Sequence, residues 1–171
     1  MSMNVVNNGV KFGYRVANWN ITRGLDYWAS DLSTKILSEE VREFWVAYTN
    51  KSIIDMLDAY VDVRFVYEGR MFLFAVHKWS SIEELTKAKA DFDILMEYAA
   101  SQMHAMLTVL DSIGLRQHHL DDIFSIVCDA NDKKHSEKNG DGKITKGPDW
   151  YKPEAKIEEY FNTLNLKVEF K

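Results

Sequence analysis

Apolar side chains recur at helical spacing along most of the first 130 residues. Leu37, Val41 and Phe44, for example, follow one another at intervals of three or four positions, which is typical of a helix with one packed face. The only prolines, Pro148 and Pro153, lie near the C-terminus, so no proline interrupts a helix before that point. The pattern therefore predicts an all-α protein built as a helical bundle.

Five helical segments are expected in this part of the chain. They run from about Phe12 to Ala29, from near Asp31 or Ser33 to a turn at Asn50 and Lys51, from Ile53 toward His77, from Ser81 to Gly114, and from about His118 to Ala130. Ser52 is suited to cap the third helix, and Ser81 with Glu84 forms a capping box for the fourth. The third segment is apolar nearly all round, which predicts a central buried helix paired with the second in an antiparallel hairpin.

From residue 131 onward the chain is polar and rich in glycine and lysine, without helical periodicity. This composition predicts a long loop with a small hairpin around GDGKIT, residues 140–145. Pro153 can open a last short helix that runs through Phe161. Because there is no internal repeat and no second core, we expect one helical domain over residues 1–171, with an irregular tail over residues 130–171 that completes a site.

Composition and charge narrow the possible functions. With 171 residues, 46% of them hydrophobic, the chain is large enough to bury a core and too apolar to be disordered. A net charge of −5 argues against nucleic-acid binding, which usually needs a basic surface. The single cysteine, Cys128, lies among apolar residues and is expected to be a packed thiol in a reducing compartment.

Neither a targeting signal nor a membrane span is expected. The first residues lack a charged region followed by a long apolar run, so they do not resemble a secretory signal. The most apolar stretch, residues 61–76, is interrupted by four charged side chains and is too short to cross a bilayer. We therefore expect a cytoplasmic protein that does not associate with membranes.

Two clusters of carboxylates flank the turn between the second and third predicted helices. They consist of Glu39, Glu40 and Glu43 before the turn and of Asp55, Asp58 and Asp62 after it. Counted outward from the turn, Glu43 is level with Asp58, and Glu40 with Asp62. A buried carboxylate costs several kcal/mol unless it is paired, protonated or bound to a metal. A metal site is therefore the first hypothesis, and a solvated acidic face or a network with lysines is the alternative.

Oxygen ligands suit Mg²⁺ or Mn²⁺ better than zinc, which prefers nitrogen and sulfur. The clusters hold more carboxylates than one Mg²⁺ needs, since this ion keeps waters and takes phosphate oxygens. Two or more ions with a polyphosphate are the natural fit. A di-iron bundle is the competing helical metal site, but it needs a Glu-x-x-His on each of two helices. None of His77, His104, His118 or His119 has a glutamate at that spacing.

The two acidic segments, EExxE followed by DxxDAxxDVxFV, resemble the all-α nucleotide pyrophosphohydrolases, the superfamily of MazG, the dimeric dUTPases and phosphoribosyl-ATP pyrophosphohydrolase. The second motif of that family is usually ExxD. Here Ala59 stands three residues before Asp62, so the motif aspartates are either Asp58 with Asp62, as in phage-type members, or Asp55 with Asp58. The tail is similar to the same subgroup, with Asn131-x-x-Lys134 followed by Lys146-Gly147-Pro148.

The resemblance implies a Mg²⁺-dependent hydrolase that cuts nucleoside triphosphates between the α and β phosphates. It implies that two or more Mg²⁺ ions, with Mn²⁺ as a possible substitute, are held by Glu40, Glu43, Asp58 and either Asp62 or Asp55. Glu39, or a carboxylate left outside the metal ligands, would with Glu43 serve catalysis by orienting the attacking water. Asn131, Lys134 and Lys146 would bind the substrate.

The resemblance further implies a homodimer or homotetramer that controls nucleotide pools, in a host cytoplasm if the protein is viral. The base preference is not predicted by the motifs. An alternative of another class is a non-catalytic helical protein that retains the acidic cage for stability, or binds nucleotides without cutting them.

Overall fold

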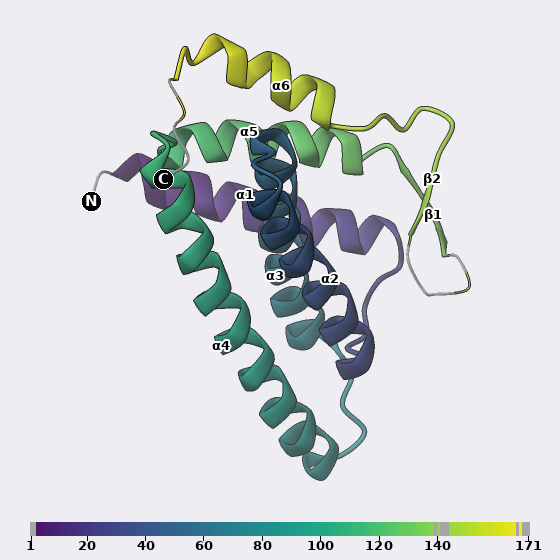
Figure 1. Ribbon diagram of the computed structural model, residues 1–171. Helices are drawn as coiled ribbons and strands as arrows, with labels where there is room; N and C mark the ends of the chain where they lie inside the picture. Colours follow the sequence, from purple (N-terminus) through teal and green to yellow (C-terminus); the bar gives the residue numbers. More distant parts are fainter. Residues whose placement is uncertain (1–2, 139, 141–143, 167, 169–171) are drawn as a thin grey trace.

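The computed structural model describes residues 3–138, 140, 144–166 and 168 (Figure 1). Over these residues the chain forms six helices and one two-stranded hairpin, which confirms the all-α prediction. The elements are α1 (Met3–Thr22), α2 (Ser30–Thr49), α3 (Ile53–Val76), α4 (Ile82–Ser112), α5 (Gln117–Asn131), β1 (Lys134–Lys138), β2 (Ile144–Lys146) and α6 (Glu154–Thr163).

Helices α2 and α3 form the most extensively packed pair, joined by a tight turn in which Lys51 has a φ of 56°. Helix α3 also contacts α1, α4, α5 and α6, which confirms that it is the central helix. In Figure 1, α2 and α3 stand side by side, the longer α4 runs along them, and α1, α5 and α6 cross one end of the pair. The two acidic segments thus lie on α2 and α3, the best-packed pair of helices in the fold.

The core is one cluster of buried apolar side chains to which all six helices contribute. Its fully buried members include Val16, Phe44, Met56, Met106, Phe124 and Ile157. Cys128 is also buried, and burial raises the pKa of its thiol to about 12. The expectation of a packed thiol is therefore confirmed.

The first helix differs most from its predicted bounds, because it runs from Met3 to Thr22 instead of from Phe12 to Ala29. It stops before Gly24, which adopts a φ of +61°, a left-handed conformation that glycine tolerates without strain. Helix α2 then begins at Ser30. Ser33 does not cap it; its hydroxyl is buried inside the helix and donates to the Ala29 carbonyl at 2.7 Å.

The predicted cap of α4 is confirmed in part. The Ser81 hydroxyl accepts a hydrogen bond from the Glu84 backbone N–H at 3.1 Å, as an N-cap does. The Glu84 carboxylate accepts from the backbone N–H of Ser80 instead of Ser81, at 2.8 Å. Ser52 is the N-cap residue of α3, but its hydroxyl donates to the Asp55 carboxylate at 2.6 Å and does not cap a backbone N–H.

The lysine-rich tail is more regular than its composition suggests. Strands β1 and β2 pair antiparallel with Lys134 opposite Lys146, which confirms the predicted hairpin; its residues 139 and 141–143 lie outside the described part of the chain. Helix α6 follows Pro153 and packs on α3 and α5. Among the described helices, none has the length and apolar run needed to span a membrane.

Candidate functional site

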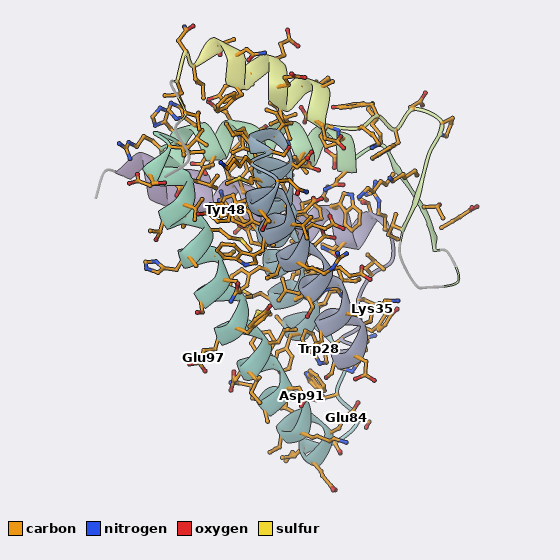
Figure 2. The ribbon with its side chains drawn as sticks, viewed as in Figure 1. Trp28, Lys35, Tyr48, Glu84, Asp91 and Glu97 are labelled. Carbon is orange, nitrogen blue, oxygen red and sulfur yellow. The ribbon has the colours of Figure 1, made fainter. Side chains whose placement is uncertain are left out.

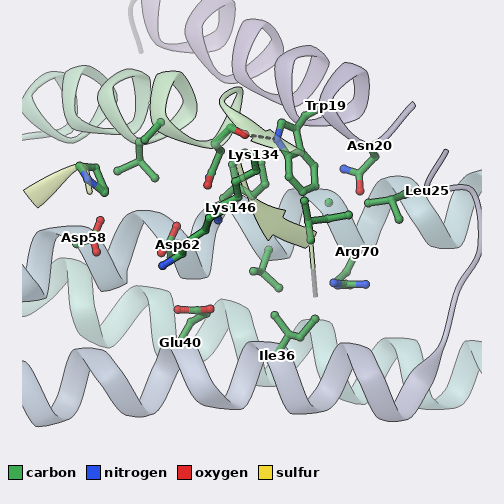
Figure 3. A pocket seen from close by; sticks show the side chains of 18 of the residues that line it. Trp19, Asn20, Leu25, Ile36, Glu40, Asp58, Asp62, Arg70, Lys134 and Lys146 are labelled. Atoms are coloured by element: carbon green, nitrogen blue, oxygen red, sulfur yellow. Dashed lines mark hydrogen bonds between the residues drawn. The ribbon is translucent and has the colours of Figure 1, made fainter. Parts of the chain in front are cut away.

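A pocket of about 430 Å³ opens beside the α2–α3 hairpin (Figure 3). Helices α2 and α3 line one side, and the ends of α1 and α5, the β1–β2 hairpin and the start of α6 line the rest. Among the described elements, every helix except α4 and both strands therefore contribute to this pocket.

The pocket has two chemically different halves because the faces of α2 and α3 change along their length. On α3 the lining residues Asp58 and Asp62 are followed at helical spacing by Val66, Gly69, Arg70 and Leu73. On α2, which runs in the opposite direction, Leu32 and Ile36 precede Glu40 and Glu43. Figure 3 shows Asp58, Asp62 and Glu40 at one end and Ile36, Leu25 and Arg70 at the other.

The acidic half brings together four of the predicted carboxylates, Glu40, Glu43, Asp58 and Asp62. A fifth, Glu154 in the first turn of α6, also lines the pocket. Sequence reasoning missed Glu154, because it lies almost a hundred residues from the acidic hairpin and belongs to no motif. The only signal was its place just after Pro153, at the start of a predicted helix.

Burial dominates the electrostatics of the two aspartates. Together with the charges of Asp62, Glu154 and Glu43, it raises the pKa of Asp58 to about 8. Burial also raises the pKa of Asp62, to about 6, but the nearby Lys134 opposes this increase. The Oδ1 atom of Asp58 is buried and has no hydrogen-bond partner among the described residues. Burial and the neighbouring carboxylates therefore favour the protonated form of Asp58 when no metal ion is bound.

Two lysines from the hairpin lie over this acidic half (Figure 3). Lys134 is partly buried; burial lowers the pKa of its ammonium group, while Asp62, Glu40 and Asp58 raise it. Lys146, its partner across the strands, places Nζ 3.9 Å from the centre of the Trp150 ring. The antiparallel pairing thus holds two cations at one end of the hairpin, facing the carboxylates.

Asn131 is buried at the end of α5 and lines the same pocket. Its backbone carbonyl accepts hydrogen bonds from Trp19 Nε1 at 2.9 Å and from Arg23 Nη2 at 3.3 Å. Arg23 also donates to the Lys134 carbonyl at 2.8 Å. These contacts tie α1 to the junction between α5 and β1, and so position both Asn131 and Lys134.

Two predicted site residues, Glu39 and Asp55, do not line the pocket. Asp55 is exposed in the first turn of α3, where Ser52 binds it. Glu39 is partly buried one position away from Glu40, and thus turns to a different face of α2. Of the two aspartates that the motif left open, the pocket therefore contains Asp62.

The donor set fits a hard cation such as Mg²⁺. All the acidic groups supply oxygen, and the unpartnered Oδ1 of Asp58 is a ligand atom with no protein donor near it. Among the described residues, no three acidic, histidine or cysteine side chains form a complete metal-binding group. A magnesium ion here would keep several waters or take oxygens from a substrate, which is its usual behaviour.

Comparisons with protein-family models, with curated proteins and with solved structures find no match for this chain.

Proposed function

We propose that the protein is a Mg²⁺-dependent nucleoside triphosphate pyrophosphohydrolase. The observation that carries the proposal is the two-part pocket, in which five carboxylates and two lysines gather at one end and apolar side chains line the other. A nucleoside triphosphate has the same division, with charged phosphates at one end and a flat, weakly polar base at the other. The resemblance of the acidic segments to nucleotide pyrophosphohydrolases supports the same activity.

The length of the pocket is compatible with such a substrate. Asp62 and Arg70 lie eight residues apart on α3, which corresponds to about 12 Å along the helix axis. This distance leaves room for a sugar and a base beyond the phosphates. In our proposal the phosphate chain lies over the acidic half and the nucleoside lies in the apolar half.

In this proposal Glu40, Glu43, Asp58 and Asp62 would hold the magnesium. Bound there, the ion would neutralise the phosphate oxygens and lower the pKa of a water molecule. The lysines Lys134 and Lys146 donate to phosphate oxygens as point charges, which an acidic protein needs in order to bind a polyanion.

The chain also supplies groups for the proton transfer. A water molecule attacks the α phosphorus, the bond from that phosphorus to the bridging oxygen breaks, and a nucleoside monophosphate and pyrophosphate leave. The proton of the water goes to a carboxylate beside it. Glu154 is our first assignment for this carboxylate because it lines the pocket and its Oε2 is buried without a hydrogen-bond partner among the described residues. Glu39, the expectation from sequence, is the second.

The test is hydrolysis of the eight common ribo- and deoxyribonucleoside triphosphates with Mg²⁺ or Mn²⁺, followed by chromatography of the products. We expect a monophosphate and pyrophosphate from at least one nucleotide. Glu43→Gln should abolish this release with an unchanged helical circular dichroism spectrum, since Glu43 is exposed at the pocket rim. Glu97→Gln, on the exposed face of α4 in Figure 2, is the matched control and should keep full activity. Full activity of Glu43→Gln would refute the proposal.

A non-catalytic nucleotide-binding protein is the second candidate. The raised pKa of Asp58 favours it, because a protonated Asp58 lets the acidic half exist without a metal ion. Thermal stabilisation by Mg²⁺ and a nucleotide, without release of any monophosphate, would support this second function over the first.

A further inference from the structure

A cation without a counter-charge lies in the apolar half of the pocket. Arg70, on α3, lines this half together with Leu25 and Ile36 (Figure 3). Among the described residues its buried Nε atom has no hydrogen-bond partner and no carboxylate pairs with the guanidinium group, whose nearest ionisable neighbour is the Tyr27 phenol. An unpaired buried cation is costly, so its place in a pocket calls for a ligand that supplies the missing acceptors.

A hydrogen-bond acceptor lines the same pocket. Asn20, on α1, is buried, and its Nδ2 donates to the Val16 carbonyl at 2.8 Å, which sets the orientation of the amide. The amide packs against Gly69, the neighbour of Arg70, so closely that a Cβ on that glycine would lie 3.4 Å from Nδ2. The remaining polar atom of the amide, Oδ1, can only accept hydrogen bonds, and the side chain lines the same pocket as Arg70.

The two side chains have complementary hydrogen-bonding roles. Arginine only donates hydrogen bonds, through a rigid planar fork, whereas the Oδ1 of an asparagine only accepts. The apolar side chains around them suit the faces of a flat ring. Together they match a ring edge on which a carbonyl oxygen stands next to a ring N–H group.

We propose that Arg70 and Asn20 select nucleotides whose base has a carbonyl next to a ring N–H, namely guanine, hypoxanthine, uracil and thymine. In this arrangement Arg70 donates to the carbonyl oxygen, and Asn20 Oδ1 accepts from the ring N–H. Adenine has no carbonyl. Cytosine has one, but the ring nitrogen beside it carries no hydrogen. This base selection rests on the proposed function for the orientation of the nucleotide, with the phosphates at the acidic end.

Binding of nucleoside monophosphates tests base selection separately from hydrolysis, because a monophosphate has no anhydride bond to cut. Binding is measured by calorimetry in the presence of Mg²⁺ with GMP, IMP, UMP, dTMP, AMP and CMP. The dissociation constants of GMP, IMP, UMP and dTMP should be lower than those of AMP and CMP by at least about fivefold and up to about 100-fold. This is the range expected for hydrogen bonds that distinguish one base edge from another. A second comparison uses 2-aminopurine riboside monophosphate, which resembles GMP but lacks the carbonyl. It should bind as weakly as AMP.

Arg70→Met keeps an unbranched apolar stem and removes the donors. It should weaken binding of GMP and UMP to the level of AMP and CMP, and leave the latter two within about twofold. Arg42→Met is the matched control, since Arg42 is exposed on α2 and does not line the pocket. The analogue comparison uses the unaltered protein, so it decides the question even if Arg70→Met does not fold.

The outcomes separate this inference from the proposed function. A binding preference for GMP or UMP without hydrolysis of any triphosphate would support the proposed base selection and refute the proposed enzymatic activity. Hydrolysis of all triphosphates at equal rates, with equal binding of all monophosphates, would support the proposed enzymatic activity and refute the proposed base selection. An Arg70→Met variant that loses affinity equally for every monophosphate and for inorganic tripolyphosphate would place Arg70 on the phosphates and overturn the inference. If none of the monophosphates binds, the inference is likewise overturned.

Discussion

Asp58 and Asp62 lie one helical turn apart on the face of α3 that lines the pocket, and burial raises the pKa of both carboxyl groups. The pKa of Asp58 rises to about 8 and that of Asp62 to about 6; among the neighbouring charges, Asp62 has the largest effect on Asp58, whereas the opposing charge of Lys134 has the largest effect on Asp62. In the absence of a metal, burial and the neighbouring carboxylates thus favour a proton on this pair. A divalent cation would displace the proton from Asp58, since metal ligands bind in their deprotonated form.

The raised pKa of Asp58 predicts how the stability of the metal-free protein depends on pH. Between the ordinary pKa of 3.8 and the folded value of about 8, the folded state binds the proton that the unfolded state has lost. The contribution of Asp58 to the free energy of unfolding is fully present below pH 3.8 and is lost as the pH rises toward 8. The free energy of unfolding falls by at most about 1.4 kcal/mol per pH unit over this range. Urea unfolding in EDTA between pH 5 and 8 measures this slope, which Asp58→Asn should reduce.

Asp55→Asn is the control for the pH experiment, because Asp55 is exposed outside the pocket and should leave the slope unchanged. Added Mg²⁺ should raise the melting temperature of the unaltered protein at pH 8 more than that of Asp58→Asn. An equal pH slope in the unaltered protein and in Asp58→Asn would contradict a buried, protonated Asp58.

Lys134 and its neighbour Lys133 offer a matched pair of substitutions. Lys134 is partly buried in the pocket, whereas Lys133 is exposed beside it. Lys134→Met should lower the rate of pyrophosphate release by about 100-fold or more, the usual loss when one positioned donor to a reacting group is removed. Lys133→Met should remain within about twofold. Similar rates for the two variants would show that the phosphates do not contact Lys134.

Lys134→Met should also change the pH dependence of the remaining activity. Because the ammonium group lowers the pKa of Asp62, its removal lets that pKa rise. The acid limb of the rate profile should therefore shift to higher pH. A profile that keeps its position would mean that Asp62 does not need to be ionised for the reaction.

Glu154 can be compared with Glu158 on the same helix. Glu154 lines the pocket and Glu158 is exposed one turn further along α6. If Glu154 accepts the proton of the attacking water, Glu154→Gln should lower kcat by about 100-fold or more with little change in KM, while Glu158→Gln keeps the activity. Loss of activity in Glu39→Gln, together with an active Glu154→Gln, would return this role to Glu39.

A second prediction on stability concerns Arg64, far from the proposed chemistry. Its guanidinium group binds Asp121 Oδ1 at 2.9 Å and Glu68 Oε1 at 3.1 Å, and it lies 4.5 Å from the centre of the Phe124 ring. Arg64→Met would leave two poorly solvated carboxylates without their cation, so the free energy of unfolding should fall by roughly 3–5 kcal/mol. Chemical denaturation measures the change.

Arg116→Met is the control for Arg64, because Arg116 forms an exposed ion pair with Asp111. Exposed pairs contribute little, so the loss should stay below about 1 kcal/mol. Combined replacement of Arg64, Glu68 and Asp121 by apolar residues should recover much of the stability lost in Arg64→Met. A combined variant less stable than Arg64→Met would contradict this account.

The sequence by itself determined the helical class, the central position of α3 and the meeting of acidic residues across the α2–α3 turn. These features depend on local periodicity and on one short turn, and both are visible in the order of residues. The resemblance of the tail named Lys134 and Lys146 as substrate-binding residues, whereas their position opposite each other came from the strand pairing in the structure. Gly24 shows the limit of this reasoning, since helical spacing continues past the residue whose left-handed conformation ends α1.

Only the tertiary structure decided which polar residues share the pocket. Helical spacing alone treats Asp55 and Asp62 as equivalent neighbours of Asp58, but the packing of α3 turns Asp62 inward and leaves Asp55 in solvent. Glu154 and Arg70 belong to no motif, and they join the site because α6 and the far end of α3 pack around it. Such meetings depend on how helices rotate and pack over long sequence separations, which local patterns do not encode.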